Sequence, residues 1–242
     1  MRIRLPFGRT LLFLGTLFLS LLALLPLRFG IEWFGLADHG LAAREAQGSI
    51  WRGALRETQF GAVGIGDVNA GLHAFPLLAG RVRVALTRGD SEAGGDGFSG
   101  AILRAGGTSG VDNVTGPLML TPALLGRLPV TQVNLEDVTA RFVDGQCVEA
   151  AGTVRATVAG DFGGVALPQG LSGNVRCDAG ALVLALASQS SMETLELRLS
   201  GDGRYTASGL IRSTDTALQQ RMAAAGFTLT GQGYAMTVNG SF

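Results

Sequence analysis

The stretch LELRLSGDGRY, residues 195–205, carries the two signals that decide the fold. Leu195, Leu197 and Leu199 alternate with charged residues, which is the period-two pattern of a β-strand with one face towards a core. The turn sequence Ser200-Gly201-Asp202-Gly203 follows at once. So short a connection indicates an antiparallel neighbour, because a parallel crossover needs about a dozen residues or more.

The same alternation recurs along much of the chain. Its apolar positions include Val82, Val84 and Leu86, then Val154, Ala156 and Val158, then Tyr234, Met236, Val238 and Phe242. Two segments, residues 121–126 and 213–225, instead carry the capping and stop residues of short helices. We therefore expect residues 41–242 to form one mainly β domain. It would be an antiparallel, twisted, meander-like sheet with one or two short helices.

The composition agrees with many short strands and excludes two classes of protein. Glycine contributes 37 of 242 residues, about twice the usual share, as frequent tight turns require. Hydrophobic residues make up 47% and charged residues 16%, which excludes disorder caused by low hydrophobicity and high charge. The formal net charge is +0, so we expect no nucleic-acid partner.

The N-terminal part is an apolar run. Residues 10–27, TLLFLGTLFLSLLALLPL, contain no charge and follow Arg2, Arg4 and Arg9. As a helix this run would be about 27 Å long, close to the hydrocarbon thickness of a bilayer. A cleaved signal peptide also starts with basic residues, but its apolar core is shorter and residues 26–29, PLRF, are a poor cleavage site. We expect an uncleaved, single transmembrane helix.

The arginine distribution predicts how this anchor is oriented. After Arg28 the next basic residue is Arg44, so the positive-inside rule places the N-terminus in the cytoplasm. Residues 1–29 would be a cytoplasmic stub and transmembrane anchor, residues 30–40 a juxtamembrane segment, and residues 41–242 a periplasmic β domain. The expected location is the inner membrane of a bacterial cell, with membrane lipid as one contact.

Residue patterns for catalysis or metal binding are missing from the sequence. The two histidines, His39 and His73, lie far apart, and no C-x-x-C or H-x-x-x-H spacing occurs. Glu136 and Asp137 are adjacent in a predicted strand and would point to opposite faces. We expect a protein that is not an enzyme, with no catalytic, cofactor-binding or metal site, no cofactor and no small-molecule substrate.

The two cysteines, Cys147 and Cys177, are expected to form one structural disulfide. An oxidising periplasm permits the bond, and a closed loop of about 30 residues would stabilise the fold by roughly 3 to 4 kcal/mol. Cys147 follows a turn and Cys177 follows the next predicted strand, so neighbouring antiparallel strands can bring them within bonding distance. Two free thiols in a core are the alternative.

Several segments, taken in order, resemble the general secretion pathway protein N family of type II secretion systems. They are the basic start and single anchor, the segment QGSIWRG, residues 61–67 and 72–81, the two-cysteine second half, and residues 199–205 ahead of the terminal strand. The resemblance implies an inner-membrane accessory or structural component of the machine that exports folded proteins across the outer membrane. Its implied partners are other components of that system, and it brings no catalytic residues.

A second class of function stays open. Residues 181–187, ALVLALA, are apolar on both faces of a predicted strand, so both faces need a cover. The C-terminal helix could supply that cover. The alternative is a lipid or another apolar ligand, held in a β-groove tethered to the inner membrane.

Overall fold

The structure is a computed structural model that describes residues 7–29, 41–60, 63–88, 97–120, 130–158, 161–162, 165–166, 170–213 and 219–241. Its helices are α1 (Phe7–Ala23), α3 (Ala74–Leu78) and α4 (Gln219–Ala225). Its strands are β1 (Leu41–Ala42), β2 (Glu45–Ser49), β3 (Arg52–Phe60), β4 (Val63–Leu72), β5 (Val82–Arg88), β6 (Phe98–Ala105), β7 (Thr108–Leu120), β8 (Val130–Val143), β9 (Gln146–Val158), β10 (Asp161–Phe162), β11 (Val165–Ala166), β12 (Leu171–Asp178), β13 (Ala181–Ala187), β14 (Glu193–Leu199), β15 (Arg204–Ile211), β16 (Thr228–Thr230) and β17 (Gly233–Ser241).

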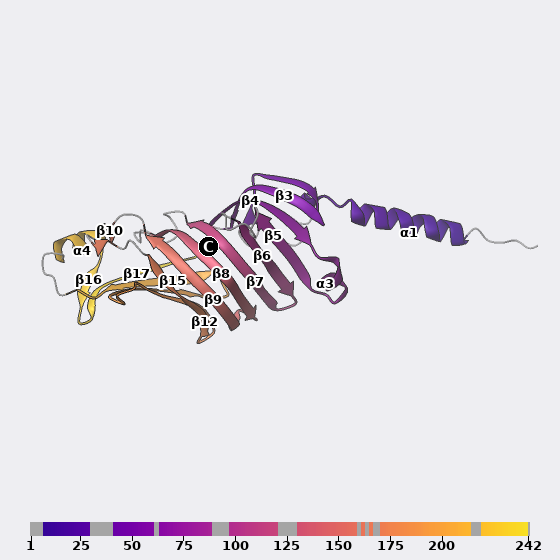
Figure 1. Ribbon diagram of the computed structural model, residues 1–242. Helices are drawn as coiled ribbons and strands as arrows, with labels where there is room; N and C mark the ends of the chain where they lie inside the picture. The colour runs from indigo at the N-terminus through magenta and orange to yellow at the C-terminus, as the bar shows by residue number, and fades with distance from the viewer. Residues whose placement is uncertain are drawn as a thin grey trace, which may run out of the picture.

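The strands form one wide antiparallel meander, which confirms the expected mainly β fold. The main sheet has 15 strands in the order β1-β3-β4-β5-β6-β7-β8-β9-β12-β13-β14-β15-β17-β16, and β2 joins it beside β3. β10 and β11 pair only with each other among the described strands. Figure 1 shows that the sheet twists along its length, so that β15 and β17 run in a different direction from β5 to β9.

The register sorts the side chains into two faces. Residues directly opposite each other share a face, as in the series Val175, Leu184, Leu197 and Ala207 from β12 to β15. We call this the inner face. Its buried side chains form the core, and they include Leu55, Val68, Leu86, Val114, Val138, Val154, Val175, Leu195, Tyr205, Ile211 and Tyr234.

The opposite side of the sheet, the outer face, carries ion pairs between strands. They are Arg56–Asp67, Arg83–Asp112, Arg141–Glu149, Arg155–Glu136 and Arg198–Asp178. The expected alternation of apolar and charged residues therefore produces one packed face and one hydrated face, as is common in antiparallel sheets.

Helix α1 begins the described chain and lies outside the sheet. The apolar side chains described from Leu11 to Leu21 are exposed, with Leu11 at 71% and Phe18 at 66% of their full accessible surface. Figure 1 shows it projecting from the end of the sheet that contains β3. Of the helices within the described ranges, none combines the length and the hydropathy of a membrane span.

The smaller elements agree with the expectations only in part. Helix α4 occupies the second half of the predicted segment 213–225, and the predicted helix at 121–126 lies outside the described residues, as does the juxtamembrane segment 30–40. Helix α3 lies outside the two segments predicted to be helices. It has only five residues with Pro76 in the middle, too few to show a helical period in the sequence.

Candidate functional site

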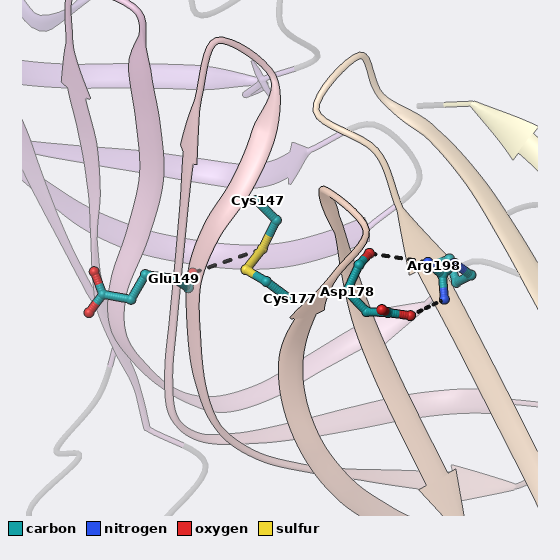
Figure 2. Close-up of a disulfide and its surroundings, with 5 residues drawn as sticks. All are labelled: Cys147, Glu149, Cys177, Asp178 and Arg198. Atoms are coloured by element: carbon teal, nitrogen blue, oxygen red, sulfur yellow. Dashed lines mark hydrogen bonds and ion pairs between the residues drawn. A yellow bond between two sulfur atoms is a disulfide. The ribbon is translucent and has the colours of Figure 1, made fainter.

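The two cysteines form a disulfide between β9 and β12. The α-carbons of Cys147 and Cys177 lie 5.5 Å apart, and the described chain contains no free cysteine. The bond lies beyond the end of the β9–β12 ladder, whose last pair is Thr153 with Asn174. Figure 2 shows it beside Asp178, which points away from the sulfurs towards Arg198.

Asp178 and Arg198 make the most connected ion pair near this bond. Arg198 Nη1 donates to Asp178 Oδ2 at 2.8 Å, and Nη2 donates to the Asp178 carbonyl oxygen at 3.1 Å. The side-chain hydrogen bond lowers the pKa of Asp178, and the positive charge of the same guanidinium adds to that shift. Since both groups are in contact with solvent, the pair links β12 to β14 across β13 rather than forming a reactive centre.

The arrangement of the polar residues supplies no metal centre within the described ranges. Those residues contain no group of three or more His, Cys, Asp or Glu side chains able to hold a metal ion. His73 is exposed and precedes α3 as its N-cap, whereas His39 lies outside the described residues. Glu136 and Asp137 are used separately, in the pair with Arg155 and in hydrogen bonds with Thr115.

The inner face is the first candidate binding surface. A set of its apolar side chains is only half-buried while packing against the core, and it runs across the middle of the sheet from β5 to β14. These residues are Val84, Ile102, Val111, Leu118, Val133, Leu135, Leu182, Leu184, Leu197 and Leu199. They give the protein a broad apolar surface of strands that touches water in part.

The stretch 181–187, which forms β13, has apolar side chains on both faces of the sheet. Leu182, Leu184 and Leu186 point to the inner face, and Val183 to the outer face. Val183 is 0% exposed, although it lies opposite Arg176 on β12 and Arg198 on β14. The long aliphatic stems of arginines can cover such a residue while their charges stay in water. The outer face of this strand therefore needs no apolar ligand.

The free edge of β17 is the second candidate surface. β17 pairs with β15 along nearly its whole length, but on its other side β16 covers only Gly233 to Ala235. Thr228 Oγ1 donates to the carbonyl oxygen of Ala235 at 3.2 Å, so the backbone polar groups of Ala235 face β16. Polar groups of successive strand residues point to alternate sides. The backbone N–H and C=O groups of Thr237, Asn239 and Ser241 therefore point to the same side as those of Ala235, at positions that β16 does not reach.

We call residues 236–241 of β17 the open edge. Within the described part of the chain, no strand pairs with its outward side. Charged residues, prolines and register shifts usually protect an exposed edge, and the open edge contains none of these. An edge of this kind can accept an additional strand through main-chain hydrogen bonds.

At the opposite end of the sheet, the chain that leaves α1 pairs with one end of β2. Pro26 forms a β-bridge with Ser49, and the Ile50 N–H donates to the Leu25 carbonyl oxygen at 2.9 Å. Its outermost strand β2 also begins with a charged residue, Glu45, which hydrogen-bonds with Gln47. The two ends therefore differ: the chain after α1 pairs with the Ser49 end of β2, whereas no described strand pairs with the outward side of residues 236–241 of β17. The alternation in the sequence located β17 but contained no signal for its place at the edge.

Comparison with known proteins gives one match. The profile of a protein family described as type II secretion system (T2SS), protein N, matches residues 39–237, which include the described sheet almost entirely. No curated protein matches the chain, and no solved structure matches it.

Proposed function

The chain belongs to the type II secretion system protein N family, and from this membership we propose an accessory and structural role in that system, anchored in the inner membrane. In this role the protein takes part in the export of folded proteins across the outer membrane. It would act by holding other components of the machine and not as an enzyme.

The proposed anchor is the apolar N-terminal segment. α1 exposes large apolar side chains along its length, among them Leu12 and Phe13 at 69% and 65%. Exposed side chains of this kind are costly in water and favourable in lipid. Residues 10–27 continue the uncharged run beyond the end of α1. We propose that this segment crosses the inner membrane once, with the N-terminus in the cytoplasm and the sheet in the periplasm.

The proposed binding element is the open edge of β17. A partner component with an extended segment could add one strand there, bonding to the outward N–H and C=O groups of Thr237, Asn239 and Ser241. The added strand would place apolar residues beside Met236 and Val238 on the inner face and polar residues on the outer face. The absence of charge on residues 236–241 favours a partner segment that is also uncharged.

A proline substitution tests this role directly. Thr237→Pro removes an N–H that points outward, and proline is tolerated at an edge position of that kind, so the sheet should stay folded. In cells that depend on this protein for secretion, we expect the variant to accumulate normally while the secreted substrates remain in the periplasm. The matched control Thr237→Ala keeps the backbone donor and should secrete normally. Normal secretion by a folded Thr237→Pro variant would contradict the proposed edge.

The half-buried inner face supports a second candidate, the binding of a lipid or another apolar ligand. The test uses the full chain in vesicles that contain a phospholipid with a photoreactive group in its acyl chain. If the inner face holds lipid, labelled peptides should include those of β8 and β13, which carry Leu135 and Leu184. Labelling confined to the N-terminal segment and to the end of the sheet beside it would reject lipid binding on this face.

A further inference from the structure

The five-residue helix α3 carries the most exposed apolar side chains among the described residues. Phe75 and Leu78 each expose 87% of their surface, more than any other large hydrophobic side chain whose exposure the structure describes. No residue of α3 is fully buried, and packing within the protein does not account for the apolar side chains of Phe75 and Leu78. A large aromatic and a leucine held in water together indicate a contact outside the chain.

Backbone hydrogen bonds place the start of α3 near the chain that follows α1. The Ile50 N–H donates to the carbonyl oxygen of Leu25, and the Leu72 N–H donates to the carbonyl oxygen of Ile50, both at 2.9 Å. Leu72 ends β4, and α3 begins two residues later at Ala74. Figure 1 shows α1 and α3 at the same end of the sheet. A bilayer that contained α1 would therefore have its surface close to α3.

The charges around α3 suit the surface of such a bilayer. Residues 68–88 contain no Asp or Glu, and they include His73, Arg81, Arg83 and Arg88. Arg81 is exposed and follows the helix directly, whereas Arg83 is paired with Asp112. Apolar side chains next to an exposed arginine are typical of segments that lie at the membrane interface, where the cation meets lipid phosphates.

We propose that α3 is a second membrane contact, in which Phe75 and Leu78 enter the boundary between headgroups and acyl chains and Arg81 binds lipid phosphate. This inference rests on the proposed insertion of the N-terminal segment. A single helix leaves the attached domain free to rotate and tilt, but a second contact fixes its orientation. The open edge of β17 would then be presented to partners at a defined angle to the membrane.

Fluorescence quenching by brominated lipid tests this contact in the full chain. The variant Phe75→Trp is placed in vesicles of phosphatidylcholine and phosphatidylglycerol, with the phosphatidylcholine brominated in its acyl chains. The unsubstituted chain provides the signal of Trp33 and Trp51 for subtraction. The matched control is Leu229→Trp, at a position that is 61% exposed on β16 at the other end of the strand order.

We expect the brominated lipid to quench the indole at position 75 several-fold more than the indole at position 229. Arg81→Glu should reduce that quenching, whereas Arg81→Lys should preserve it. Equal, weak quenching at both positions would overturn the proposal.

Washing the vesicles with alkaline carbonate separates this failure from that of the anchor. A chain that is retained but not quenched at position 75 disproves only the second contact. A chain that is washed off disproves the anchor, and the second contact with it.

Discussion

Cys147 and Cys177 are joined by a disulfide just where the backbone ladder between their strands has stopped. The register that ends at Thr153 and Asn174 would, if continued, place Cys177 opposite Ala150 and not opposite Cys147. Cys147 is held there by its N–H, which donates to the Gly180 carbonyl oxygen at 2.8 Å. The disulfide therefore ties together two strand ends that the β9–β12 ladder does not connect.

Replacing both cysteines by serine should destabilise the fold without abolishing it. The sequence separation of 30 residues corresponds to a loss of about 3 to 4 kcal/mol in the chain-entropy treatment of a closed loop. Thermal unfolding followed by circular dichroism should show a lower Tm, and reduction of the unsubstituted protein should lower the Tm by a similar amount. Unchanged melting in the double variant would argue against a stabilising role, and loss of secretion by a folded double variant would indicate a redox role.

Gly173→Ala should destabilise the sheet by about 3 kcal/mol, since overpacking of this kind typically costs 1 to 3 kcal/mol. Gly173 lies opposite Leu186 on the inner face, and an added β-carbon would collide with the carbonyl oxygen of Ala185 and lie 2.8 Å from its carbonyl carbon. Urea unfolding measures the change. The neighbouring exposed position supplies the control, because Ser172→Ala should stay within about 0.5 kcal/mol of the unsubstituted protein. A similarly small effect of Gly173→Ala would show that β12 and β13 lie farther apart than described.

Thr58→Val should stabilise the protein by about 1 kcal/mol. Thr58 is 1% exposed, and its hydroxyl has no hydrogen-bond partner among the described residues. It lies at an irregularity in the pairing of β3 with β4. Valine keeps the shape and removes the unsatisfied hydroxyl, whereas Thr58→Ser keeps the hydroxyl, loses a methyl group and should destabilise. Chemical unfolding of both variants and of the unsubstituted protein checks this order of stabilities. A Thr58→Val variant less stable than the unsubstituted protein would reveal a partner for the hydroxyl.

The pair of Asp178 and Arg198 predicts an acid-dependent loss of stability. The pKa of Asp178 in the folded protein is lowered from its ordinary value of 3.8, so the carboxylate favours folding at pH values above that. This contribution is lost as the pH falls through the lower, folded pKa. Asp178→Asn should therefore be less stable than the unsubstituted protein at neutral pH, and the two should converge below about pH 3.8. Unfolding measured across this range tests the effect.

A double substitution shows whether the ion pair causes that effect. In an Arg198→Gln background, the change Asp178→Asn should have almost no further effect at neutral pH. If it destabilises the protein equally in both backgrounds, the stabilisation of the Asp178 carboxylate comes from groups other than Arg198.

Local sequence patterns were sufficient to predict the strands and to tell which residues of a strand share a face. Leu195, Leu197 and Leu199 lie on one side of β14 because successive residues of any strand point to opposite sides, wherever that strand is placed. The turn residues predicted antiparallel neighbours, and the meander is antiparallel throughout the described pairings. The ordered set of segments also indicated the family that matches residues 39–237.

The candidate surfaces required the tertiary structure. Tyr234, Met236 and Val238 alternate in the same way as Leu195, Leu197 and Leu199, yet β17 lies at an open edge while β14 lies between two strands. Whether a strand finds a neighbour depends on pairing between distant parts of the chain, which a period-two pattern does not encode. The exposure of Phe75 and its place beside α1 likewise depend on Leu25, Ile50 and Leu72, three residues brought together only by folding. The sequence therefore determined which residues form each strand and which of them share a face. Non-local pairing decided which strand lies at an open edge and which short helix is exposed.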